Sequence, residues 1–491
     1  MSIVTYQPEF SPALPTVFGP KEYNEFRRTL EAMDRILTKS GLENDFIVRH
    51  LRLNLHHGDK PKPRFCVVRR ALRCSILLAI TGVSYRELSL RMADSMLFQW
   101  FTGMAKIDRI CAVSKSTLER YEKMFSNQEI RDLVHKLNLA ISDKSVLEEL
   151  PQKDSQIRFD QIFADTTCVK ANIHFPVDWV LLRDAVRTLI KAIELIRAHG
   201  LRHRISTPSE FTRKMNKLCI EMTQVRKKPN ARKKRKLVLR RIKKLAQLVQ
   251  GHAENYHRVL TSHWRNTDLS EMEARVIVAR IENVLKQLPH AIHQAHERII
   301  GERKVKNQDK ILSLYEPDVH VLVRGKSGAE VEFGNALYIA EQSDGFIVDW
   351  EFIKGQPPAD NKLVSDSIVR ITREYGKPKS FTADRGFDSP ANKIDLEKLS
   401  IINAICPRSV QLLDEKIDDD IFCRLQKRRA MTEARIAIFK NAYLGNPLRS
   451  KGFKNRRIRI EWCILAHNLW KISVMAAQKS RPQEEQPEKV A

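Results

Sequence analysis

The spacing of apolar residues changes along the chain of 491 residues, and this change constrains the fold most strongly. From about Glu22 to Leu147, and again from about Trp179 to Ile300, apolar residues recur every three or four positions, which is typical of helices that bury one face. A short strand-like run, Ile157–Ala164, lies between these stretches, and after about Lys304 the period changes to two. The sequence therefore predicts a helical amino-terminal region and an α/β region that a long helical insertion interrupts.

The α/β region predicts a mixed sheet flanked by helices. Besides the first strand, we expect strands at Asp318–Arg324, Val331–Glu341, Phe346–Ile353, Ser380–Asp384 and Ile401–Cys406. The turn Gln342–Gly345 joins two of these strands as a hairpin. We expect the helices that follow the hairpin at Asn361–Tyr375, Leu425–Tyr443 and Ile460–Ala477.

The charge of the chain predicts a polyanionic partner. Lys and Arg number 86 against 59 Asp and Glu, which gives a net charge of +27, and the excess recurs along the chain. Nucleic acid fits this charge because each neutralised phosphate releases counterions and adds affinity. A solubilising or ribosome-associated basic surface is the alternative.

The strongest basic run, Arg226–Leu245, lies in the predicted insertion. It contains Lys233, Lys234, Arg235 and Lys236, and no acidic residue occurs between Arg226 and Leu248 to offset the charge. We predict that these side chains bind DNA phosphates, while a solvated helix face or a linker is the alternative.

The length exceeds what one hydrophobic core usually supports, so several domains are expected. We predict a helical DNA-binding domain at 1–150, a sheet-bearing domain at 151–178 and 305–478, a basic helical insertion at 179–304, and a disordered tail at 479–491. The eight cysteines form no C-x-x-C pair, which favours reduced thiols in an intracellular protein. The first residues show neither a basic leader nor an apolar segment, so we expect a soluble, cytoplasmic protein without membrane contact.

Two helix starts in the amino-terminal region match the capping box, in which a serine and a glutamate satisfy backbone amides reciprocally. They begin at Ser84 and Ser116, with glutamates three residues later. The second predicts a helix at Thr117–Met124, flanked by basic residues that include Lys115 and Arg120. This arrangement suits the recognition helix of a helix-turn-helix, although helix pairs of this kind also serve packing alone.

Three carboxylates are candidates for catalysis by their placement. Asp165 and Asp384 lie at the predicted carboxyl ends of two strands, where α/β sheets usually present their ligand sites. Glu433 lies on a predicted helix. Three such groups can bind two divalent ions about 4 Å apart, which suits phosphodiester cleavage.

The helical face around Glu433 carries further polar groups. Gln426, Arg429 and Lys440 fall within roughly 40° of Glu433 on a helix of 3.6 residues per turn. A carboxylate with neighbouring cations suits a metal ligand beside a bound phosphate, whereas an ordinary exposed face of a basic helix is the alternative.

Several short motifs occur in and after the predicted strands: Asp165-Thr-Thr167, Asn172-Ile173, Pro176-Val-Asp178, Leu312 to Pro317, Arg324-Gly-Lys326, Glu332-Phe-Gly334, Asp384-Arg-Gly-Phe-Asp388, and Gln426-x2-Arg429-x3-Glu433-x6-Lys440. Together they resemble the motifs of the DDE transposases of bacterial insertion sequences. The last string is similar to the Y-x2-R-x3-E-x6-K signature of one group within this family. Gln426 stands where that signature has tyrosine, so a stacking contact is not expected there.

The resemblance implies an RNase H-like fold and a transposase that cuts DNA at terminal inverted repeats and joins the 3′ ends to target DNA. It implies Asp165, Asp384 and Glu433 as metal ligands for Mg²⁺, with Mn²⁺ able to substitute, and a homo-oligomer on double-stranded DNA. Arg385, Gln426, Arg429 and Lys440 would contact phosphates beside the cut end. The alternatives are a transposase-derived DNA-binding protein without catalysis, and a related nuclease that does not join strands.

One further cluster has the residue types of a metal site. His290, His293, His296 and Glu297 lie on a predicted helix, but they lack the i, i+4 histidine pair of zinc proteases. We therefore predict an ordinary polar face there.

Overall fold

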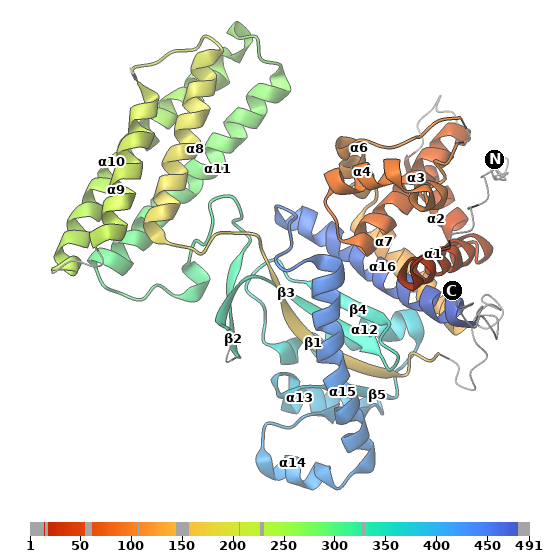
Figure 1. Ribbon diagram of the computed structural model, residues 1–491. Coiled ribbons are helices and arrows are strands. Elements are labelled where there is room, and N and C mark those ends of the chain that lie inside the picture. Colours follow the sequence, from red (N-terminus) through yellow and green to blue (C-terminus); the bar gives the residue numbers. More distant parts are fainter. Residues whose placement is uncertain are drawn as a thin grey trace, which may run out of the picture. The chain divides into compact units, whose positions relative to one another are not determined.

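The computed structural model describes residues 14, 18–54, 61–106, 108–143, 157–205, 207–225, 230–326 and 329–479 (Figure 1). The chain falls into two compact units, which are described separately. The first unit comprises Met1–Val169, Ala336–Ile353 and Pro357–Ala491, and the second comprises Lys170–Asn335 and Lys354–Gln356.

The strands form one mixed sheet. They are β1 (Gln161–Lys170), β2 (His320–Lys326), β3 (Ala329–Gln342), β4 (Ile347–Phe352), β5 (Ser380–Ala383) and β6 (Ile402–Ile405). The order is β2-β3-β1-β5-β6, and β4 also pairs with β3. β5 runs parallel to β1 and to β6, whereas β2 and β4 run antiparallel to β3. The predicted α/β class, with a mixed sheet flanked by helices, is confirmed.

The first strand differs from the prediction in both of its limits. β1 begins four residues later than the predicted Ile157 and continues to Lys170, so Asp165 lies inside the strand and not at its end. The residues that follow include the β-branched Thr166 and Thr167, which favour extended backbone. β5, on one side of β1, is short, but the long β3 lies on the other side and offers β1 a hydrogen-bonding neighbour after β5 has ended. Asp165 therefore lies two residues beyond the last pair of the β1–β5 ladder, and not at the end of β1.

Some helices of the first unit flank the sheet, and the others form the amino-terminal part of the unit. They are α1 (Lys21–Lys39), α2 (Leu42–Asn54), α3 (Pro61–Thr81), α4 (Tyr85–Asp94), α5 (Met96–Phe101), α6 (Lys115–Glu122), α7 (Asn127–Ser142), α12 (Val364–Tyr375), α13 (Pro390–Lys398), α14 (Val410–Ile417), α15 (Asp420–Ile438) and α16 (Phe453–Lys479). Shorter turns are η4 (Asp360–Leu363), η5 (Arg385–Phe387) and the π-helical η6 (Phe439–Leu444). α16 packs against α1, α3, α7 and β4, so the amino-terminal helices and the sheet share one hydrophobic core.

Buried polar contacts reinforce this shared core. The Arg459 guanidinium lies 2.8 Å from the carboxylate of Glu122, and the Trp462 indole donates to the Glu122 carbonyl at 3.0 Å. These contacts join α16 to the end of α6. The structure thus places the predicted amino-terminal domain and most of the sheet-bearing domain in one compact unit, whereas β2 and the first half of β3 belong to the other unit.

Ser84 and Ser114 begin the two helices for which capping was predicted. Ser84 caps α4, because its side chain accepts from the amide of Glu87, but the Glu87 carboxylate binds Arg91, so only the serine half of the predicted capping box forms. Ser114, and not Ser116, caps α6, since Ser114 has extended backbone and accepts from the amide of Thr117. Ser116 already lies in the first turn of the helix, so the prediction was wrong by two residues.

The second unit contains most of the helical stretch predicted at Trp179–Ile300. Its helices are α8 (Asp178–Ala198), α9 (Pro208–Val225), α10 (Ala231–His263) and α11 (Glu271–Ala295), which pack on one another as a bundle (Figure 1). They enclose a hydrophobic core of their own, formed by apolar residues at helical spacing such as Leu239, Ile242 and Ile281. The antiparallel pairing of β2 with the first half of β3 also belongs to this unit.

Two further predictions concern the surroundings of the chain. None of the helices within the described residues is both long enough and apolar enough to cross a membrane. Most of the predicted disordered tail, residues 480–491, lies outside the described residues.

Candidate carboxylate site

The register of the parallel strands brings two of the predicted carboxylates level with each other. β1 pairs with β5 through Ile162 opposite Phe381 and Phe163 opposite Thr382. Two further steps along both chains bring Asp165 opposite Asp384, and neighbouring strands lie about 4.8 Å apart. Asp384 comes directly after β5, where its Oδ1 accepts from the Gly386 amide at 2.8 Å. The register therefore places the two aspartates level with each other, two residues beyond the last pair of the β1–β5 ladder.

Helix α15 covers the face of β1 that carries Asp165. Side chains two residues apart on a strand share a face, so Phe163, Asp165 and Thr167 point to the same side of β1. Phe163 packs against Phe422 and Leu425 of α15. Beyond Asp165, Thr167 Oγ1 accepts from Lys440 Nζ at 3.2 Å. Asp165 thus lies between two contacts of β1: Phe163 contacts α15, and Thr167 contacts the π-helical η6 that follows α15.

Glu433 lies midway between two contacts on its own helical face. Seven residues before it, Gln426 Nε2 donates to the carbonyls of Ala383 and Ala404, at the ends of β5 and β6, at 3.2 and 2.6 Å. Seven residues after it, Lys440 reaches Thr167 of β1. Because seven residues nearly close two turns of an α-helix, Gln426 and Glu433 share the face of α15 that contacts the ends of β5 and β6, while Lys440 reaches β1 from the π-helical η6.

The carboxylate of Glu433 nevertheless remains apart from the two aspartates. Its side chain is 57% exposed, and Arg429 Nη1 lies 3.4 Å from its Oε1. Within the parts of the chain that the structure describes, no three Asp, Glu, His or Cys side chains are gathered as a metal site. The structure thus brings Asp165 and Asp384 together and places Glu433 on the helix that faces them.

A fourth carboxylate, Asp360 of η4, lies at the same place and was not among the predicted residues. Its Oδ1 accepts from Thr166 Oγ1 at 2.9 Å. A Cβ added to Gly386 would lie 2.9 Å from Asp360 Oδ2 and 3.0 Å from Asp384 Oδ1. In the sequence, Asp360 follows two prolines and precedes a helix, which is also the pattern of a helix-capping aspartate, so its place beside β1 had no local signal.

The donor set suits a hard divalent cation. Carboxylate oxygens from Asp165 and Asp384, with Glu433 on the facing helix, are the ligand type that Mg²⁺ and Mn²⁺ prefer over nitrogen or sulfur. These three residues are the ones that would bind the ion.

The basic residues predicted around the site have different surroundings. Arg385 is exposed directly after Asp384. Arg429 Nε donates to Gln426 Oε1 at 3.0 Å, while its Nη1 lies near Glu433. Gln426 itself uses both amide hydrogens on backbone carbonyls, so the predicted phosphate contact does not fit its placement. The glutamine ties α15 to the ends of two strands instead.

Two other arginines of α15 serve the packing of the first unit. Arg428 and Arg435 bind the buried carboxylate of Glu341 at 3.0 and 3.3 Å, and Thr432 donates to it at 2.8 Å. Burial lowers the pKa of Arg428. These contacts fix one side of α15 on β3 and leave Arg429 and Glu433 on another side of the helix.

The basic run of the insertion forms the first turns of α10, except for Arg226–Pro229, which lie outside the described residues. Lys233 and Lys234 are exposed, and the Arg235 guanidinium lies 5.5 Å from the centre of the Trp179 ring. Lys236 Nζ lies 2.7 Å from Glu302, which also pairs with Arg232. Glu302, which lies outside the run in the sequence, therefore offsets part of its charge.

The predicted recognition helix α6 packs on α3 and α4. Its basic residues Lys115, Arg120 and Lys123 are all exposed. Lys123 pairs with Glu119 at 2.7 Å, and Arg120 Nη2 donates to Thr117 Oγ1 at 3.1 Å. The exposed face is compatible with a nucleic-acid contact as well as with a solvated helix.

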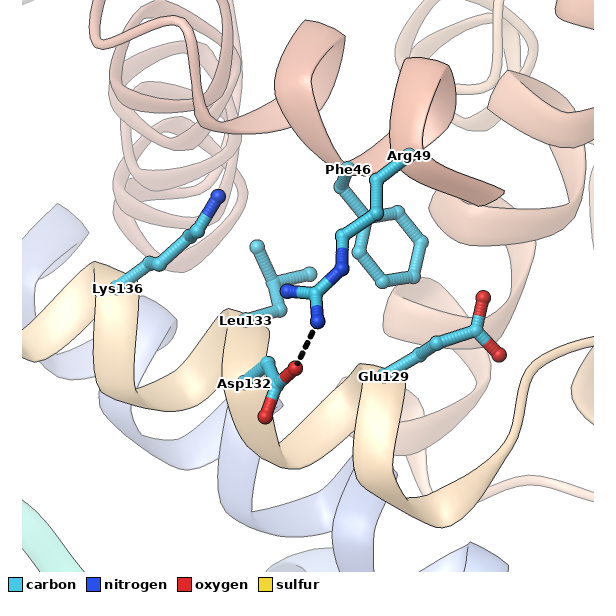
Figure 2. A pocket seen from close by; sticks show the side chains of 6 residues that line it. All are labelled: Phe46, Arg49, Glu129, Asp132, Leu133 and Lys136. Carbon is cyan, nitrogen blue, oxygen red and sulfur yellow. Dashed lines mark ion pairs between the residues drawn. The ribbon is translucent and has the colours of Figure 1, made fainter. Parts of the chain in front are cut away.

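Two other features lie outside the carboxylate site. A hollow between α2 and α7, lined by Phe46, Arg49, Glu129, Asp132, Leu133 and Lys136, encloses about 10 Å³, which suits one water molecule at most (Figure 2). The Arg49–Asp132 ion pair of 2.9 Å crosses it. In the second unit, His296 Nδ1 lies 2.9 Å from Lys243 Nζ, and the histidine cluster of α11 forms no metal site among the residues described.

Comparison with known proteins found no matching family model, no matching curated protein and no matching solved structure.

Proposed function

We propose that this protein is a DDE-type DNA transposase that cuts at the ends of a mobile element and joins the 3′ ends to target DNA. The observation that supports this function best is the path of α15 across the ends of β5 and β1. Its contacts at Gln426 and Lys440 hold the helix that carries Glu433, and the turn after it, against the strands that carry or precede Asp165 and Asp384. This combines the motif resemblance with an arrangement in which three carboxylates can converge.

The RNase H-like assignment belongs to the same proposal. It is supported by a mixed sheet in which β1 lies between the antiparallel pair β3–β4 and the parallel strands β5 and β6. The carboxylates occupy the end of the β1–β5 ladder, and the helix that follows β6 and the short α14 carries Glu433.

The proposed chemistry requires divalent ions and a positioned phosphodiester. When bound, Mg²⁺ supplies Lewis acidity that activates the attacking oxygen and stabilises the leaving oxygen. Asp165, Asp384 and Glu433 bind the ions, while Arg385, Arg429 and Lys440 hold the scissile phosphate through charge-assisted hydrogen bonds. Glu433 must leave Arg429 to join the aspartates, and the incoming phosphate can take its place on the guanidinium.

The proposed partner is double-stranded DNA, bound by a homo-oligomer. The net charge of +27 and the exposed basic residues of α6 and α10 support a partner rich in phosphates. We assign end recognition to the amino-terminal helices and sequence-independent phosphate contact to α10.

A DNA-binding protein without catalysis is the second candidate. The ion pair between Glu433 and Arg429 favours it, because a carboxylate held by an arginine is not available to a metal ion. A nuclease that cuts without joining would use the same carboxylates.

One assay separates these functions. Labelled duplexes that carry the DNA flanking the coding sequence are incubated with the full-length protein and Mg²⁺, with plasmid DNA as the target. A transposase gives nicked ends and joined products, a nuclease gives nicked ends alone, and a silent protein gives a retarded complex alone.

The carboxylates are tested in the same assay. We expect Asp165→Asn, Asp384→Asn and Glu433→Gln each to reduce cleavage at least about a thousandfold while end binding remains within about threefold of wild type, because metal ligands act on the barrier of the reaction. Glu415→Gln, an exposed acid on α14, is the matched control and should cleave normally. Normal cleavage by Glu433→Gln would remove Glu433 from the site.

A further inference from the structure

Asp360 connects the two strand ends on which the proposed site depends. Its Oδ1 accepts from Thr166 Oγ1 at 2.9 Å, and the amide of Thr166 donates to Asp165 Oδ1 at 2.7 Å. A chain of two hydrogen bonds thus links Asp360 to Asp165. Because side chains alternate along a strand, Thr166 points away from the face of Asp165, and Asp360 approaches β1 from that other face.

The second oxygen of Asp360 lies against the turn that follows β5. A Cβ at Gly386 would meet Asp360 Oδ2 at 2.9 Å and Asp384 Oδ1 at 3.0 Å, which is too close unless the carboxylates move. Asp360 Oδ2 and Asp384 Oδ1 therefore lie within about 6 Å of each other, on either side of the space that a Cβ at residue 386 would occupy. Gly386 provides the space that lets a second carboxylate approach Asp384.

We propose that Asp360 is a positioning residue of the carboxylate site, which holds Asp165 in place through Thr166 and adds negative charge beside Asp384. This inference rests on the proposed function. Groups that orient metal ligands commonly contribute tenfold or more to metal affinity. The charge of Asp360 also favours cation binding, because without a cation the neighbouring carboxylates repel one another.

The test measures metal binding separately from catalysis. Full-length wild type, Asp360→Asn and Asp384→Asn are titrated with Mn²⁺ alone by calorimetry, and the Mg²⁺ concentration for half-maximal cleavage is measured for each active protein. We expect Asp360→Asn to weaken Mn²⁺ binding about tenfold and to raise the half-maximal Mg²⁺ concentration by a similar factor. Binding of end DNA without metal should stay unchanged.

Two more variants serve as controls for charge and for folding. Asp366→Asn removes an exposed acid from the first turn of α12 and should bind Mn²⁺ like wild type. Thr166→Val keeps every carboxylate and removes only the hydroxyl that Asp360 accepts from, so it should weaken Mn²⁺ binding less than Asp360→Asn. This second variant also tests the inference if Asp360→Asn fails to fold.

The outcomes distinguish this inference from the proposed function. If wild type cleaves, Asp384→Asn is inactive, and Asp360→Asn has wild-type metal dependence, Asp360 has no role and the function stands. An equal loss in Asp366→Asn would reduce the effect to general charge and overturn the inference. If wild type neither binds Mn²⁺ nor cleaves, the proposed function fails, and the role of Asp360 fails with it.

Discussion

Glu461 of α16 is a buried carboxyl group whose protonation affects the stability of the first unit. Only 2% of the residue is exposed, and its Oε2 accepts from the indole nitrogen of Trp350 at 2.7 Å. Burial raises the pKa of Glu461 from its ordinary value of 4.5 to about 7, although Arg131 and the indole hydrogen bond act in the opposite direction. The folded protein therefore retains a proton that the unfolded chain releases between these values.

This retained proton makes the free energy of unfolding decrease as the pH rises. A group with a raised pKa in the folded state contributes stability that is complete below pH 4.5 and is lost as the pH rises through 7. We expect Glu461→Gln, which keeps the acceptor for Trp350 but cannot ionise, to be more stable than wild type at pH 8 by about 2 to 3 kcal/mol.

Urea unfolding at pH 5 and pH 8 checks this prediction. The stability difference between the two proteins should be small at pH 5 and grow toward pH 8. Glu415→Gln, on the surface, should follow wild type at both pH values. A difference that is independent of pH would show that Glu461 does not titrate in this range.

At the scale of single elements, one hydroxyl group caps the start of α6. Ser114 accepts from the Thr117 amide, whereas Ser116 lies within the first turn. We expect Ser114→Ala to reduce the free energy of unfolding by about 1 kcal/mol, and Ser116→Ala to change it by less than about 0.5 kcal/mol. Thermal unfolding of the two variants compares them directly, and a larger loss in Ser116→Ala would contradict the assignment of the cap.

The basic face of α10 divides into paired and unpaired side chains. Among the described residues, Lys233, Arg240 and Lys244 are exposed and make no ion pair, whereas Arg232 and Lys236 pair with Glu302, and Arg241 pairs with Glu221. Lys233, Arg240 and Lys244 share one face, because seven and eleven residues nearly complete two and three turns.

If this face binds DNA phosphates, its charges determine the salt dependence of binding. Replacing Lys233, Arg240 and Lys244 by Gln should reduce the slope of log affinity against log salt by about 2 to 3, since each phosphate contact contributes about 0.9. The matched triple variant of Arg232, Lys236 and Arg241 should change the slope less. Equal slopes in wild type and the first variant would exclude α10 from the DNA contact.

The sequence predicted those elements whose determinants lie within the element itself. The helices of the insertion and the strands β3 and β4 follow from apolar periodicity, which lies within the segments themselves. The end of β1 does not, because the strand continues beside β3, far away in the sequence. Asp360 and the carbonyl contacts of Gln426 were missed for the same reason, since both join segments that only the fold brings together.

At the scale of the whole molecule, the two units have separate hydrophobic cores. Leu77 is fully buried in the core of the first unit, and Leu239 in that of the second. We expect calorimetry to show two unfolding transitions. Leu77→Ala and Leu239→Ala should each lower one transition, with a loss of about 2 to 5 kcal/mol, and leave the other nearly in place. A single transition that both variants shift equally would show that the units unfold together.

The chain leaves the first unit at the end of β1 and returns within β3, and these strands are neighbours in the sheet. Because the insertion starts and ends on adjacent strands, a short turn could join these strands in its place. The segment between Lys170 and Ala336 can therefore gain or lose whole helices over evolutionary time without changing the register that aligns Asp165 with Asp384. In such an architecture the proposed catalytic centre and the proposed DNA-contacting bundle can diversify at different rates.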